Sequence, residues 1–155
     1  MITTEQTITV TINGTTYERE VAARKLLIHF VRDDLDLTGS HIGCDTGNCG
    51  ACSMLVDGML VKSCMMLAVQ ADGTTIETVE GLSDGDELNT LQAAFREHHA
   101  LQCGYCTPGI LMSATALLRE SPSPSDDEIK KALQGNICRC TGYWNIFEAV
   151  KAVAR

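Results

Sequence analysis

The chain has 155 residues, which is enough for one ordinary domain or two small ones. Twenty acidic side chains against twelve basic ones give a formal net charge of −8, and no run of Lys and Arg occurs, which argues against binding nucleic acid or an anionic membrane. The apolar fraction of 45% is normal for a globular protein and excludes general disorder. No apolar run is long enough to span a membrane, and Met1–Val10 lacks the apolar core of a signal peptide, so we expect a cytoplasmic protein.

The eight cysteines need an explanation other than disulfides, because thiols stay reduced in the cytoplasm. They fall in two sets of four, separated by the 38 cysteine-free residues 65–102. Four thiolates are the full ligand complement of one tetrahedral metal ion or one iron–sulfur cluster, so each set predicts one metal site. We therefore expect two modules, residues 1–80 and 81–155, joined near an acidic, glycine-containing linker at Glu80–Asp86. The two sets are Cys44, Cys49, Cys52 and Cys64, and Cys103, Cys106, Cys138 and Cys140.

The first module has the alternation of apolar and polar residues that is typical of strands. Asn13-Gly14 and Asp57-Gly58 each predict a tight hairpin turn between two such segments. Apolar residues at 26, 27, 30 and 31 recur at helical spacing and predict one short amphipathic helix before Asp33. A small sheet crossed by one helix is the expected shape. The predicted strands are Ile8–Ile12, Thr15–Val21, Ser53–Val56, Met59–Lys62 and Thr74–Val79.

The second module has helical periodicity throughout. Thr107-Pro108 predicts an N-cap followed by a proline in the first helical position. Ser121–Ser125 interrupts the pattern, and Ser125 stands three residues before Glu128 in a capping box whose helix is stopped by Gly135. Four short helices, forming a small bundle, are expected. Their apolar residues are Leu88, Leu91 and Phe95 beside Gln92; Ile110, Leu111, Ala114, Leu117 and Leu118; Ile129 and Leu133; and Ile146, Phe147, Val150 and Val153.

The first cysteine set has the Cys-x4-Cys-x2-Cys spacing of plant-type ferredoxins, with Cys64 as the distant fourth ligand. Three glycines in the loop Gly43–Ala51 permit positive φ angles, which turn backbone amides toward a cluster. A zinc knuckle is the alternative, but zinc sites favour two close cysteine pairs. A Rieske cluster is excluded, because it needs two histidine ligands and neither His29 nor His41 has suitable spacing.

The second set, Cys103-x2-Cys106 and Cys138-x-Cys140, is compatible by spacing with either zinc or an iron–sulfur cluster. Cys106 directly precedes the predicted helix start, where the positive end of the helix favours a thiolate. That placement suits both kinds of site. A disulfide within Cys138-Arg139-Cys140 is sterically poor.

Longer sequence motifs around the cysteines are more informative about the kind of site than the cysteine spacing alone. Together they resemble the small iron–sulfur subunit of the molybdenum hydroxylases, the xanthine oxidase family. The stretches Leu26–Phe30, Leu37–Thr46 and Val61–Ala71 are most similar to the small subunit of the aerobic, molybdenum-type carbon monoxide dehydrogenases. The motifs that carry the family resemblance are Gly43–Ser53, Val79–Leu82, Gln102–Gly109 and Gly135–Tyr143.

The resemblance implies an α+β chain: a β-grasp, ferredoxin-like domain at residues 1–80 followed by an all-α, four-helix-bundle domain at 81–155. It implies one [2Fe-2S] cluster on each cysteine set, and contacts from Gln102 and Cys140 to the molybdopterin. It also implies a large subunit that holds molybdopterin cytosine dinucleotide, a medium subunit that holds FAD, and a dimer of heterotrimers or heterodimers. Electrons would pass from molybdenum through the helical-domain cluster and the ferredoxin-like cluster to FAD or an external acceptor. The chain itself would have no catalytic residues and no substrate site.

Other functions remain open at this point. The complex could oxidise carbon monoxide, an N-heterocycle, a purine or an aldehyde. A free-standing ferredoxin-type carrier is disfavoured because it would not need the helical module, and a zinc-dependent interaction module would be colourless. We expect Tyr105 to shield the second cluster, Trp144 to anchor a core or an interface, and Arg139 and Tyr143 to lie near the partner.

Overall fold

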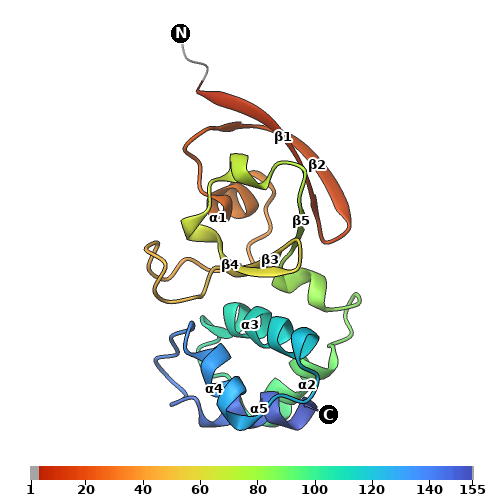
Figure 1. The fold of residues 1–155 in the computed structure, drawn as a ribbon, viewed down its shortest axis with the longest axis vertical. Coiled ribbons are helices and arrows are strands. Elements are labelled where there is room, and N and C mark those ends of the chain that lie inside the picture. The colour runs from red at the N-terminus through yellow and green to blue at the C-terminus, as the bar shows by residue number, and fades with distance from the viewer. Residues whose placement is uncertain (1–3, 155) are drawn as a thin grey trace.

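The computed structural model describes residues 4–154, so the first three residues of Met1–Val10 and the last residue of the predicted helical domain lie outside the described residues. A β-sheet module is followed along the chain by a helical one, and the two are stacked with the helix α3 (Thr107–Glu120) against β3 (Ser53–Val56) of the sheet, as Figure 1 shows. The chain is thus mixed α and β, as expected. No described helix is long and apolar enough to cross a membrane.

The sheet contains five strands in the order β2-β1-β5-β3-β4. Both predicted hairpins form, and Asn13, Gly14, Asp57 and Gly58 have positive φ angles of 50°, 82°, 48° and 79°, as type I′ turns require. The strand β5 pairs parallel with β1 and antiparallel with β3. It is shorter than predicted, because a 3₁₀ turn begins at Val79. The remaining strand bounds are Glu5–Ile12 for β1, Thr15–Ala22 for β2, Met59–Lys62 for β4 and Thr75–Glu77 for β5.

The predicted short helix of the first module is confirmed, with a change of pitch. It begins as α1 (Leu27–His29) and continues as a π-helical turn over Phe30–Asp34. Three of the four apolar residues behind the prediction, Leu27, Phe30 and Val31, are buried in the core of this module together with Ile28, whereas Leu26 is the N-cap and only partly buried. The core of this module is formed chiefly by Ile8, Val10, Ile12, Leu27, Ile28, Phe30, Met54 and Ile76.

The second module contains the four predicted helices: α2 (Thr90–Glu97), α3, α4 (Asp126–Leu133) and α5 (Trp144–Val153). The helix α5 packs against α2 and α4, and α3 packs against α4 and α2. This module has a hydrophobic core of its own, separate from that of the sheet. Its largest buried members are Leu91, Phe95, Ile110, Leu111, Ile129, Leu133, Ile146, Phe147 and Val150.

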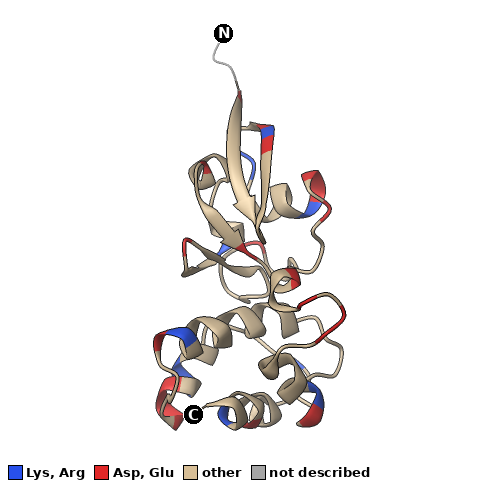
Figure 2. Ribbon diagram, turned by 90° about the vertical axis from the view of Figure 1, so that its right-hand side faces the viewer, with Lys and Arg blue, Asp and Glu red and all other residues tan. Residues whose placement is uncertain are grey.

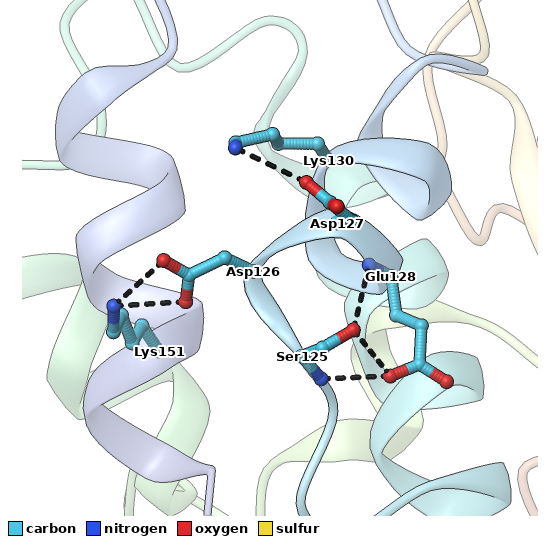
Figure 3. A network of polar contacts seen from close by, with 6 residues as sticks. All are labelled: Ser125, Asp126, Asp127, Glu128, Lys130 and Lys151. Carbon is cyan, nitrogen blue, oxygen red and sulfur yellow. Dashed lines mark hydrogen bonds and ion pairs between the residues drawn. The ribbon is translucent and has the colours of Figure 1, made fainter.

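Helix caps account for the places where the predicted helix starts were right or wrong. The capping box at the start of α4 is confirmed: the Ser125 hydroxyl accepts a bond from the Glu128 amide, and the Glu128 carboxylate accepts one from the Ser125 amide (Figure 3). Leu88 was wrongly placed in the first helix; it is 45% exposed and precedes Asn89, the true N-cap. Thr107 is the first residue of α3 rather than its cap, a shift of one residue.

The predicted linker is wrong in its first part. Val79–Leu82 forms a 3₁₀ turn, and the Glu80 carboxylate accepts a hydrogen bond of 2.7 Å from the Gly39 amide. The first residues of the predicted linker are therefore folded against the sheet module and do not form a free linker. Charged residues are scattered over both modules, as Figure 2 shows, in keeping with the acidic composition.

Candidate metal centres

The first cysteine set gathers where the loop before β3 meets the 3₁₀ turn Ser63–Met65. Cys52 and Cys64 are buried, whereas Cys44 and Cys49 are partly exposed. The backbone amides of Thr46, Asn48 and Cys49 converge on Cys44 Sγ at 3.4, 3.3 and 3.3 Å. These donors, that of Cys49 first, lower the pKa of the Cys44 thiol to about 6. The loop therefore stabilises negative charge on sulfur, as a cluster loop must.

The inner pair of this set behaves in the opposite way. Burial, together with the neighbouring Cys52 thiol, raises the pKa of Cys64 to about 11. Two buried thiols side by side resist ionisation unless a cation shares the site, because the second thiolate is repelled by the first. The first set thus contains one thiol, Cys44, that ionises easily, and a buried pair, Cys52 and Cys64, that would ionise when a metal binds.

The second set joins the N-terminus of α3 to the loop between α4 and α5. Cys103 Sγ and Cys140 Sγ are 3.5 Å apart and both residues are exposed. Cys106 and Cys138 form an inner pair, and burial followed by the Cys138 contact raises the pKa of Cys106 to about 12. Burial opposes ionisation of Cys138 as well, but hydrogen bonds led by that from Thr141, whose hydroxyl lies 3.0 Å from Cys138 Sγ, leave its pKa lowered.

The donor chemistry fits two-iron clusters. All four thiols of the second set meet, arranged as two pairs, which is what two adjacent irons with two thiolates each require. In addition, Thr107, which directly follows Cys106 in the chain, has a buried Oγ1 without a protein hydrogen-bond partner. In the first set, contacts connect Cys44, Cys52 and Cys64, and Cys49 belongs to the same loop.

One residue that holds the second loop, Tyr143, was not singled out for this role from the sequence. The Tyr143 hydroxyl accepts a hydrogen bond from the Cys138 amide at 2.9 Å and donates one to the Asn136 carbonyl at 3.1 Å. Tyr143 itself has a left-handed backbone with φ of 68°. Its phenol thus braces the turn that presents Cys138 and Cys140. A Tyr three residues after a Cys-x-Cys motif is the only signal in the sequence.

The two cysteine sets face each other across the boundary between the modules. A cavity of about 210 Å³ is lined by Cys49 of the first set and by Cys103 and Cys106 of the second. Over it, Tyr105 stacks on His41 with ring centroids 4.6 Å apart, and its hydroxyl donates to the Ile42 carbonyl at 2.7 Å. Tyr105 is therefore a bridge between the modules, and it is half exposed.

Most of the residues expected to meet a partner lie at the surface, whereas Tyr143 is partly buried against the helical core. Gln102 is exposed beside Cys103, and Arg139 is exposed beside Cys140. Trp144 is 67% exposed, so its expected role as a core anchor is wrong and only that at an interface remains. Trp144 borders a groove of about 330 Å³ that is also lined by Tyr143 and Phe147.

Comparison with known proteins agrees with this geometry. A model described as "2Fe-2S iron-sulfur cluster binding domain" matches residues 10–82, and one described as "[2Fe-2S] binding domain" matches residues 78–151. The nicotine 6-hydroxylase small subunit of Paenarthrobacter nicotinovorans is 55% identical over 92% of this chain and 86% of its own length. The caffeine dehydrogenase subunit gamma of Pseudomonas sp. strain CBB1 is 51% identical over 95% of this chain and 90% of its own length.

A solved structure extends the likeness to three dimensions. A chain of quinoline 2-oxidoreductase from Pseudomonas putida 86 superposes with a TM-score of 0.95 and 49% identity, covering 98% of this chain and 94% of that one. Two tandem iron–sulfur domain models and relatives matched over almost their whole length account for both modules. The chain accordingly belongs to the small [2Fe-2S] subunits of the molybdenum hydroxylase family, the electron-transfer components of multi-subunit oxidoreductases.

Proposed function

We propose that this subunit carries electrons from a molybdenum cofactor on a large partner subunit to FAD on a medium subunit or to an external acceptor. The observation that carries the proposal is the gathering of the four thiols of the second set into two pairs, of which the outer pair, Cys103 and Cys140, is exposed at the surface. Each [2Fe-2S] cluster supplies one-electron redox chemistry when bound. The proposed ligands are Cys44, Cys49, Cys52 and Cys64 for the first cluster, and Cys103, Cys106, Cys138 and Cys140 for the second.

The second site is the one we assign to the large subunit. Its outer pair, Cys103 and Cys140, is exposed, whereas the first site hides Cys52 and Cys64. Exposed large apolar side chains follow or precede the thiols closely in the chain, and such residues favour an interface over open solvent. Within this surface, Gln102 and Cys140 are the proposed contacts to the pterin. The apolar residues are Leu101, Tyr105, Ile137 and Trp144.

For the substrate of the complex, an N-heterocyclic compound is the best-supported class. Three of the similar proteins are named for nicotine, caffeine and quinoline, which are nitrogen heterocycles, whereas others are aldehyde oxidoreductases. The resemblance to carbon monoxide dehydrogenase rested on three short stretches of sequence, and none of these relatives is named for that gas. The domain limits 1–80 and 81–155, the description of the second domain as a four-helix bundle, the cytoplasmic location and a dimeric assembly belong to the same proposal.

The variant Gln102→Ala, in the assembled complex, tests the assignment of the second site. Gln102 is exposed in the free chain, and in the complex its amide would be covered by the pterin, so removing it would leave polar groups of the cofactor unpaired at a cost of about 1–3 kcal/mol. We expect unchanged iron content, with slower reduction of the clusters by substrate or partial loss of molybdenum cofactor. Gln6→Ala, an exposed glutamine on β1, is the matched control and should have no effect. Wild-type reduction rates and full molybdenum occupancy in Gln102→Ala would contradict the assignment, and purification of the native chain without any large partner would favour a free-standing carrier.

A further inference from the structure

Asn136 is a buried polar side chain at the boundary between the two cysteine sites. It is 3% exposed and follows α4, two residues before Cys138. Its Nδ2 donates to the Gly50 carbonyl of the first cysteine loop at 3.0 Å, and its Oδ1 accepts from the Ser113 hydroxyl of α3 at 2.7 Å. The orientation is dictated by Gly50, because a carbonyl oxygen can only accept and the atom facing it must be the amide nitrogen.

The neighbouring peptide makes a second contact in the same direction. The Ile137 amide donates to the Cys49 carbonyl at 2.8 Å. Two consecutive carbonyls, those of Cys49 and Gly50, are therefore held by donors from two consecutive residues, Asn136 and Ile137. Because Ile137 precedes Cys138, this clamp connects one predicted ligand of each cluster through a single hydrogen bond.

Close packing around these two hydrogen bonds restricts movement of the two loops relative to each other. A Cβ on Gly50 would collide with the Gly135 carbonyl and lie 2.6 Å from Asn136 Nδ2. A Cβ on Gly109 of α3 would collide with the Gly50 carbonyl and lie 2.9 Å from Ala51 Cα. We call this contact, between residues 49–51 on one side and Gly109 and residues 135–137 on the other, the seam. Backbone atoms form most of its contacts, so it has little freedom to adjust.

We propose that Asn136 is a positioning residue that fixes the separation and orientation of the two cluster sites, and thereby the rate of electron transfer between them. The inference rests on the proposed function, since it needs both sites to be occupied. Gly50 is buried, so without the Asn136 amide its carbonyl loses one of its donors inside the seam. The seam would then open slightly, and the Cys49–Ile137 hydrogen bond beside it would lengthen.

The test is electron paramagnetic resonance of the fully reduced, iron-loaded protein, combined with rapid-freeze measurement of transfer between its clusters in the complex. We expect Asn136→Ala to retain its iron and both cluster signals, while the magnetic interaction between the clusters weakens and inter-cluster transfer slows several-fold. A purely structural role would lower the melting temperature but leave the interaction in the folded protein unchanged. The control Glu77→Gln removes another contact between the modules, the ion pair with Arg119 at 2.7 Å, and should leave both readouts at wild-type values.

Ser113→Ala is the second variant, because it removes only the hydroxyl that holds Asn136 Oδ1. It should weaken the magnetic interaction in the same direction but less, and this result decides the question if Asn136→Ala does not load iron. Wild-type interaction and transfer rate in Asn136→Ala, or in Ser113→Ala when the first variant fails to load, would overturn the proposal. Absence of iron from the wild-type chain is a different outcome, and it would overturn the proposed function itself.

Discussion

Replacement of Gly109 by alanine should destabilise the protein, although alanine is the better helix former. Gly109 is the third residue of α3 and is buried against the first cysteine loop. The added methyl group would collide with the Gly50 carbonyl oxygen and approach Ala51 Cα to 2.9 Å. Since these neighbours are backbone atoms, they cannot rotate away as a side chain could, and the helix must move from the sheet module.

The magnitude follows from three contributions. Forcing a methyl group into a packed site costs about 1–3 kcal/mol. Displacing the Gly50 carbonyl weakens its hydrogen bond from Asn136, a loss of about 1 kcal/mol. The helix propensity of alanine returns about 1 kcal/mol. The free energy of unfolding should therefore fall by about 1–3 kcal/mol, which lowers the melting temperature of a chain of this size by about 2–12 °C.

The measurement is thermal unfolding of the iron-loaded chain, followed by circular dichroism. Gly135→Ala is the matched control, because its Cβ would meet nothing within 4 Å and its φ is not positive. That variant should keep or raise the melting temperature, since alanine restricts the unfolded chain by about 0.4–1 kcal/mol. A Gly109→Ala protein as stable as the Gly135→Ala protein would refute the argument from close packing.

Three further predictions address the cap, an ion pair and the independence of the sites. Ser125→Ala should lower the free energy of unfolding by about 1 kcal/mol in urea titrations, because it removes the N-cap of α4; no change would show that the cap is dispensable. Arg119 lowers the pKa of Glu77, so the pair stabilises the fold above the ordinary glutamate pKa and loses this effect as the pH falls through the lowered value. Both side chains are partly exposed, so Glu77→Gln should cost less than about 1 kcal/mol at pH 7, and the difference from wild type should vanish in acid unfolding curves; a difference that grew in acid would be contrary to this sign. Cys49→Ser should abolish the first cluster signal but keep the second, because its carbonyl still accepts from Ile137; loss of both signals would show that the sites assemble together.

Local patterns allowed the sequence to predict much of the fold. The alternation of Ile8, Val10 and Ile12 was sufficient for β1, since one face of that strand is buried and the other is exposed. Ser125 and Glu128 identified the start of α4 because both partners of the capping box lie within four residues. Features of this kind are determined by neighbours in the chain, so they can be predicted without a structure.

The features that were missed depend on residues far apart in the sequence. Glu80 was assigned to a linker because its partner, the Gly39 amide, lies 41 residues earlier in the chain. Likewise, no local pattern indicates that Asn136 would donate to Gly50, or that Tyr143 would brace Cys138. The cysteine spacing predicted which thiols gather at the second site, whereas their arrangement in pairs and the seam between the sites required the three-dimensional structure.

The most direct test of the whole account is the metal content of the purified chain. Eight cysteines at four per [2Fe-2S] cluster predict about four irons and four acid-labile sulfides per chain, with two distinguishable paramagnetic signals after reduction. Their different surroundings, one set in the sheet module and one at the start of α3, are the reason for two signals. Stoichiometric zinc with little iron, in a colourless protein, would contradict the account.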